Sequence, residues 1–147
     1  MGGAAEFQSM RDFPHGVEKS PMRVLIVEDE LLIRWSVAET LGHDGHSVVE
    51  AASGAAAIAA LEDARSQSTP IDAVILDYRL PDSNDLSLLA RIRKLSPRSV
   101  VIMMTAFGTP EMTQAALNLG VFAVMNKPFE MRDLSEMLQK ASAEHGG

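Results

Sequence analysis

Four apolar residues are followed directly by three acids in the stretch Val24-Leu25-Ile26-Val27-Glu28-Asp29-Glu30. A short β-branched run without alternating polar positions is typical of a strand that is covered on both faces. After the acids, Ile33, Val37 and Leu41 recur at helical spacing, and Gly42 supplies a stop for that helix. The stretch therefore predicts a buried strand, an acidic turn and a helix.

The same order of strand and helix recurs four more times along the chain. Further strands are predicted at 47–50, 73–76, 100–104 and 121–125. Helices are predicted from the N-cap Ser53 to 64, through 88–92, from Thr109-Pro110 to Gly120, and over 134–141. Alternation of strands and helices indicates right-handed crossovers and a parallel sheet with helices on both faces, which is an α/β doubly wound fold.

Composition limits the class of protein. The 147 residues include 13 basic and 20 acidic side chains, and the net charge of −7 disfavours binding to nucleic acid or to an anionic membrane surface. No apolar run reaches the ~18 residues of a membrane span, and the absence of cysteine excludes disulfides and thiol nucleophiles. We expect a flexible leader over 1–20, native or added for expression, one domain over 21–142 and a disordered tail over 143–147.

Residues that can carry chemistry follow four of the predicted strands, namely Glu28-Asp29, Asp77, Thr105 and Lys127. The carboxyl ends of parallel strands meet at one edge of a sheet, where ligands bind at the topological switch point. Three carboxylates there would repel one another, and a hard cation such as Mg²⁺ relieves that repulsion. An aspartate so placed can act as a nucleophile toward phosphorus. Each residue alone could be a turn, cap or surface residue, but their joint occurrence favours a site.

Four segments in this order resemble the signatures of a bacterial response-regulator receiver domain. They are Val27-Glu28-Asp29-Glu30, Leu76-Asp77-Tyr78-Arg79-Leu80-Pro81, Met104-Thr105-Ala106 and Lys127-Pro128-Phe129. The resemblance covers 22–142 and implies a flavodoxin-like (βα)5 domain with strand order 2-1-3-4-5. It implies a cytoplasmic signalling protein, not an enzyme with an external substrate, that a sensor histidine kinase or phosphotransfer protein phosphorylates on Asp77. The fourth helix, fifth strand and fifth helix would then contact an effector or a second copy, without direct contact to nucleic acid or membrane.

The resemblance also implies roles for individual residues. Mg²⁺ (or Mn²⁺) would be held by Asp29, Asp77 and the backbone carbonyl of Arg79, with Glu28 acting directly or through water. The phosphoryl group would be bound by Thr105, Lys127 and the backbone N–H of Ala106. Arg79 and Phe107 would flank the path of an attacking water and tune dephosphorylation, and the bond between Lys127 and Pro128 would be cis.

Three positions depart from the family pattern. Glu28 stands where aspartate is usual, Asp85 where glycine is usual, and Val124 where an aromatic residue is frequent. A switch that moves an aromatic side chain at 124 is therefore excluded, and either Phe107 or repacking of loops and helices would carry the signal.

Two other functions remain open from the residues. A magnesium-dependent phosphatase with an aspartate nucleophile usually has a second acid two residues later, but Arg79 stands there. A degenerate receiver that serves only as an interaction module is disfavoured by the presence of Asp77, Thr105 and Lys127. The domain could be a stand-alone receiver or part of a longer regulator.

Overall fold

The computed structural model describes residues 21–145, in which five strands and five helices alternate. The strands are β1 (Arg23–Val27), β2 (Ser47–Ala51), β3 (Ala73–Asp77), β4 (Val100–Thr105) and β5 (Ala123–Asn126). The helices are α1 (Leu31–His43), α2 (Gly54–Ser66), α3 (Ser87–Leu95), α4 (Pro110–Asn118) and α5 (Met131–His145). The predicted alternation is confirmed. The leader predicted over 1–20 lies outside the described residues.

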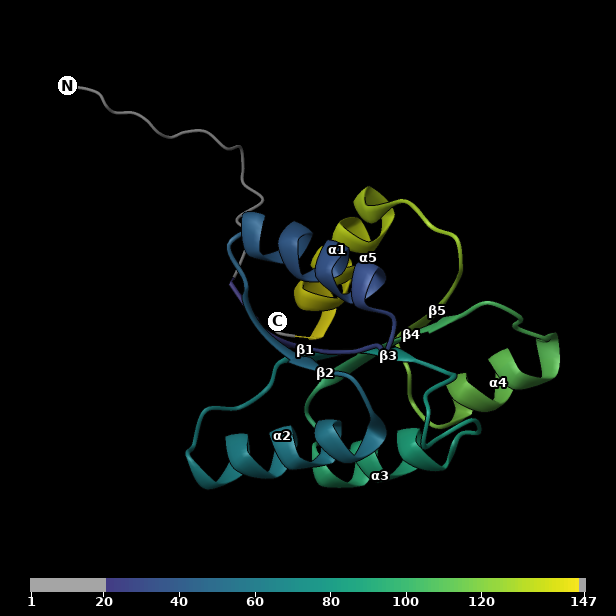
Figure 1. The fold of residues 1–147 in the computed structure, drawn as a ribbon, viewed down its shortest axis with the longest axis horizontal. Helices are drawn as coiled ribbons and strands as arrows, with labels where there is room; N and C mark the ends of the chain where they lie inside the picture. The colour runs from purple at the N-terminus through teal and green to yellow at the C-terminus, as the bar shows by residue number, and fades with distance from the viewer. Residues whose placement is uncertain (1–20, 146–147) are drawn as a thin grey trace.

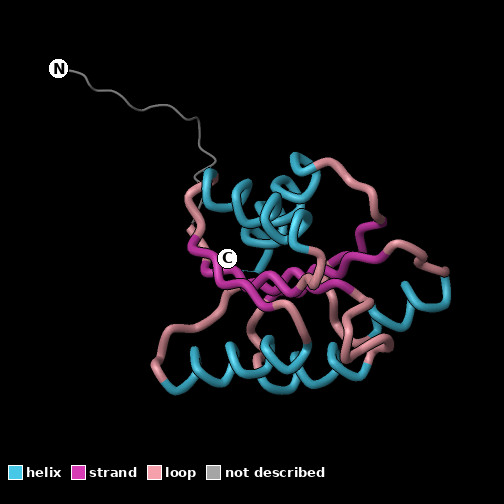
Figure 2. Tube along the Cα trace, viewed as in Figure 1, coloured by secondary structure: helices cyan, strands magenta, loops and turns pink. Residues whose placement is uncertain are grey.

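All five strands pair in parallel in one sheet with the order β2-β1-β3-β4-β5. Helices α2, α3 and α4 cover one face and α1 and α5 cover the other (Figure 1), so that the sheet forms the middle of three layers (Figure 2). The predicted doubly wound, flavodoxin-like (βα)5 fold is confirmed. From β1 the chain first goes to β2 on one side and then to β3 on the other, so the topological switch point lies between β1 and β3.

Alternate residues of the strands enter two separate cores, one on each face of the sheet. Leu25 and Leu76 belong to the core under α2 and α3, whereas Ile26 and Ile75 belong to the core under α1 and α5. The strands β3 and β4 are buried along their whole length, as continuous apolar runs predict. Each buried leucine or isoleucine contributes about 1.5–3 kcal/mol, and these contacts fix the positions of the strand ends.

Helix α1 does not stop at Gly42. It continues to His43, and Gly45 has a φ of 97° and donates its N–H to the Gly42 carbonyl at 3.0 Å. A positive φ favours glycine because it has no Cβ. The turn that ends the helix is therefore built by Gly45, and the predicted role of Gly42 was wrong.

Strand β5 begins at Ala123, two residues later than predicted. Gly120 has a φ of 100°, and the N–H of Val121 donates to the Ala116 carbonyl at 3.2 Å. This N–H therefore closes the end of α4 rather than pairing in the sheet. At the other end of the domain, α5 continues through His145, into the region predicted to be a disordered tail, and the remaining residues 146–147 are not described.

The predicted N-caps of two helices are confirmed. The hydroxyl of Ser53 accepts the N–H of Ala56 at the start of α2, and the hydroxyl of Thr109 accepts the N–H of Met112 at the start of α4. Within residues 21–145, no helix is both long enough and apolar enough to cross a membrane.

Candidate functional site

Backbone hydrogen bonds hold the residues just beyond three strand ends. The N–H of Glu28 donates to the Ala51 carbonyl at 3.0 Å, and the N–H of Lys127 donates to the Thr105 carbonyl at 2.8 Å. The N–H of Tyr78, next to Asp77, donates to the Met104 carbonyl at 2.8 Å. The sheet therefore fixes the backbone from which the candidate site residues project.

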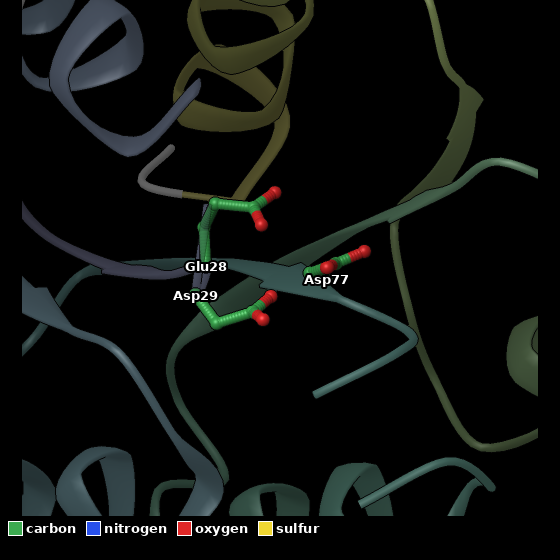
Figure 3. A group of neighbouring side chains, drawn as sticks. All are labelled: Glu28, Asp29 and Asp77. Atoms are coloured by element: carbon green, nitrogen blue, oxygen red, sulfur yellow. The ribbon is translucent and has the colours of Figure 1, made fainter. Parts of the chain in front are cut away.

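The three acids predicted to meet at this edge do so. Glu28, Asp29 and Asp77 each offer an oxygen, and these oxygens lie within 4.8 Å of one another. Figure 3 shows the Asp29 carboxylate turned toward Asp77, whereas the Glu28 side chain leaves the end of β1 on the opposite side. Glu28 is fully buried, Asp77 is 6% exposed and Asp29 is exposed. Solvent therefore reaches the cluster mainly at Asp29.

Lys127 lies among these carboxylates. Its Nζ is 2.7 Å from Oε1 of Glu28, 3.3 Å from Oδ1 of Asp77 and 3.8 Å from Oε1 of Glu30. Burial lowers the pKa of the Lys127 ammonium, but its hydrogen bond to Glu28 and the charges of Asp77 and Glu28 outweigh burial and raise that pKa. Lys127 is therefore a fixed positive charge at neutral pH.

Asp77 is held in an environment that disfavours its charged form. Burial first, and the charge of Glu28 second, raise the pKa of Asp77 from its ordinary value of 3.8 to about 6. The charge and hydrogen bond of Lys127 and a backbone hydrogen bond from Arg79 lower the pKa but do not compensate. The site thus holds more negative charge than its one lysine balances.

Thr105, the last residue of β4, and the residues after it lie at the same edge of the sheet as the acids. Thr105 is buried, and its Oγ1 accepts the N–H of Phe107 at 3.3 Å. Gly108 lies so close that a Cβ there would be 2.9 Å from Cγ2 of Thr105 and 3.0 Å from Oδ1 of Asn126. Ala106 is exposed, and the Phe107 side chain is 79% exposed.

The loop after β3 carries Asp82, whose contact sequence reasoning did not predict. Leu80 and Ser83 form a tight turn with reciprocal backbone hydrogen bonds of 2.8 and 3.2 Å. In that turn, the Asp82 carboxylate accepts the N–H groups of Gly54 at 2.8 Å and Ala55 at 2.9 Å, at the first turn of α2. These bonds lower the pKa of Asp82. No local pattern indicates this contact, because the partners are 28 positions apart.

The departures at Asp85 and Val124 have visible structural consequences. Asp85 Oδ1 accepts the N–H of Ser87 at 2.9 Å and the Ser87 hydroxyl at 2.6 Å. This acid therefore binds the first residue of α3 at a position where glycine is usual in the family. Val124 is half-buried against the core on the α2, α3 and α4 face. Arg79, next to the acids, is exposed, and the peptide bond between Lys127 and Pro128 is cis.

Acids, a threonine and a lysine thus stand at one edge of a doubly wound sheet, where the strands end. This combination of fold and site is typical of a class of signalling domain. Residues 24–139 match the family described as the response regulator receiver domain. The chain belongs to this family, and it is a receiver domain of two-component signalling, as the sequence resemblance predicted.

Individual relatives agree with this assignment. Sporulation initiation phosphotransferase F of Bacillus subtilis is 30% identical over 118 residues, which cover 80% of this chain and 91% of that protein. The transcriptional regulatory protein PdtaR of Mycobacterium tuberculosis is 32% identical over 82% of this chain, which spans only 57% of PdtaR. Among solved structures, a CheY-like receiver domain protein from Methanospirillum hungatei has a TM-score of 0.79 and 31% identity, covering 86% of this chain and 98% of its own.

Proposed function

We propose that this receiver domain accepts a phosphoryl group on Asp77 from a sensor histidine kinase or a phosphotransfer protein, in a reaction that depends on Mg²⁺ or Mn²⁺. The observation that carries the proposal is the cluster at the carboxyl edge of the sheet. There, a nearly buried aspartate lies within 4.8 Å of two further acids and 3.3 Å from a lysine ammonium.

The residues present fit a hard divalent cation. All donors are oxygens, and Lys127 balances only one of the three negative charges of Glu28, Asp29 and Asp77. Asp29, Asp77 and the backbone carbonyl of Arg79 would hold the ion. When bound, the ion neutralises charge on the oxygens of the transferring phosphoryl group.

The residues of the chain supply the rest of the chemistry. A carboxylate oxygen of Asp77 attacks phosphorus, an O–P bond forms, and the P–N bond to the donor histidine breaks with its electron pair returning to the imidazole. Lys127, the N–H of Ala106 and the Thr105 hydroxyl bind the phosphoryl oxygens. Because Thr105 Oγ1 accepts the N–H of Phe107, its own proton is available for donation.

Hydrolysis of the acyl phosphate returns Asp77 to its starting state, so the domain catalyses changes of its own state and turns over no external substrate.

Phosphorylation would shift the population toward a conformation that an effector or a second copy binds at the face of α4, β5 and α5. With Val124 in place of an aromatic, repacking around Thr105 and Gly108 would carry the change. In this role the domain would function in the cytoplasm and make no direct contact with nucleic acid or membrane.

The test is incubation with acetyl phosphate and Mg²⁺ followed by intact-mass measurement. We expect one added phosphoryl group on the unaltered protein and none on an Asp77→Asn variant. Asp63→Asn, which neutralises an exposed acid on α2, serves as the control and retains labelling. Continuous release of phosphate with no phosphoryl group retained on the protein would instead indicate a phosphatase, and no reaction would indicate an interaction module; either result refutes the proposal.

A further inference from the structure

Both oxygens of the Glu28 carboxylate have protein partners. Oε1 accepts a hydrogen bond from Lys127 Nζ at 2.7 Å, and Oε2 accepts the backbone N–H of Glu30 at 3.0 Å. The residue is fully buried. A buried carboxylate is costly unless it is paired and hydrogen-bonded, and here these two contacts meet that need.

Among the three acids near Lys127, Glu28 makes the closest contact. The distance from Nζ to Glu28 is 2.7 Å, against 3.3 Å to Asp77 and 3.8 Å to Glu30. A charge-assisted hydrogen bond of about 2.7–2.9 Å is among the strongest that proteins form. In the described residues the shortest contact of the lysine is therefore to Glu28 and not to Asp77.

The backbone on both sides of this pair is fixed. Arg34 Nη1 donates to the Glu28 carbonyl at 2.9 Å, while its Nε donates to Glu50 at 2.9 Å. On the other side, the N–H of Lys127 is bound to the Thr105 carbonyl. An aspartate at position 28 would draw the carboxylate back by one methylene, about 1.5 Å. Because both backbone segments are hydrogen-bonded, an aspartate would keep this short contact only if the Lys127 side chain moved away from its present position beside Asp77.

We propose that Glu28 is a positioning residue, which holds the Lys127 ammonium beside Asp77 in the resting domain, while Asp29 and Asp77 hold the metal ion. The inference rests on the proposed function, because Lys127 matters only if Asp77 receives a phosphoryl group. On transfer, Lys127 exchanges Glu28 for a phosphoryl oxygen. The departure at position 28 thus serves the lysine rather than the metal.

The first test measures the pairing without metal or phosphoryl donor. Urea unfolding in EDTA is compared for the unaltered protein, Glu28→Gln, Lys127→Met and the double variant. We expect Lys127→Met to destabilise the domain, because it leaves Glu28 buried without its cation. Adding Glu28→Gln should reverse this loss, with non-additivity of about tenfold or more in the unfolding equilibrium constant.

A matched cycle with Asp77→Asn in place of Glu28→Gln measures the competing pair. We expect weaker coupling between Asp77 and Lys127 than between Glu28 and Lys127. The opposite order, or additive effects in the Glu28 cycle, would overturn the proposal. If the double variants do not fold, Glu28→Asp replaces them. It keeps the charge but loses reach, and unchanged stability and labelling of this variant would also overturn the proposal.

The second test measures labelling by acetyl phosphate at saturating Mg²⁺. We expect Glu28→Gln to slow labelling about tenfold, and to have no further effect when Lys127 is already methionine, because the two residues act through one contact. If the double variant instead shows both reductions of the labelling rate multiplied together, Glu28 acts separately from Lys127, as a metal ligand would, and the proposal is overturned. If not even the unaltered protein is labelled, the proposed function fails. The unfolding measurements in EDTA still show whether Glu28 and Lys127 are coupled.

Discussion

Replacing Asp77 by asparagine should stabilise the domain at neutral pH, although it removes the residue proposed to react. Asp77 has a pKa of about 6 against an ordinary value of 3.8, chiefly because it is buried and secondly because Glu28 is close. A difference of one pH unit corresponds to about 1.4 kcal/mol. At pH 7.5 the ionised carboxylate therefore costs the folded state about 3 kcal/mol, which the Asp77→Asn variant does not bear.

The pH dependence follows from the direction of the shift. The folded protein binds more protons than the unfolded chain between about pH 4 and pH 6, so the stability due to Asp77 falls as pH rises through this window. The advantage of Asp77→Asn should therefore be near zero at pH 3.8 and reach its full size above pH 6. Saturating Mg²⁺ should stabilise the unaltered protein, by about 2.7 kcal/mol at 100 times its Kd, and the variant much less.

The measurement is urea unfolding followed by far-ultraviolet circular dichroism in EDTA, at pH values from 4 to 7.5. Asp82→Asn is the matched control, because hydrogen bonds to α2 lower the pKa of Asp82. The stability contributed by the Asp82 carboxylate is fully present above its ordinary pKa of 3.8 and is lost only as pH falls below that value. The Asp82→Asn variant should therefore be less stable than the unaltered protein by a nearly constant amount between pH 4 and 7.5. A gap for Asp77→Asn that stays constant between pH 4 and 7.5 would refute the reasoning.

Three further predictions concern the loop between β4 and α4. Gly108→Ala places a Cβ 2.9 Å from Thr105 Cγ2. We expect the free energy of unfolding in urea to fall by about 1–3 kcal/mol and labelling by acetyl phosphate to become slower. Unchanged stability and labelling would contradict the close packing. Phe107→Ala should shorten the lifetime of the acyl phosphate severalfold in an intact-mass time course, because the bulky side chain hinders the attacking water; a longer lifetime would exclude that role. Thr109→Ala removes the N-cap of α4 and should cost about 0.5–2 kcal/mol, whereas full stability would mean that another group satisfies the Met112 N–H.

Much of the fold could be predicted because its signals are local. Val24 to Val27 and Val100 to Met104 are continuous apolar runs, and both became strands covered on two faces. The same logic brought Glu28, Asp29 and Asp77 together, since parallel strands deliver their ends to one edge. The strand order came from the family resemblance, because alternation alone is compatible with several orders.

The errors and omissions have physical reasons. Gly42 and Gly45 lie close together in sequence, and only backbone geometry shows which of them needs a positive φ. The direction of the Glu28 side chain depends on a rotamer and on the position of Lys127, which comes 99 positions later in the chain. Contacts of this kind depend on tertiary structure and leave no periodic signal.

The Asp82 carboxylate, which caps the first turn of α2, has a consequence for protein engineering. Asp82 and Leu88 leave little room for a side chain at position 54. A Cβ added to Gly54 would lie 3.2 Å from Asp82 Oδ1 and 3.1 Å from Leu88. A chimaera with another receiver that joins the two parents anywhere between Ala55 and Pro81 takes the glycine from one parent and the acid from the other. Crossovers placed before Ser53 or after Leu88 keep the pair together, so module exchange in this domain should treat α2 and the loop after β3 as one inherited block.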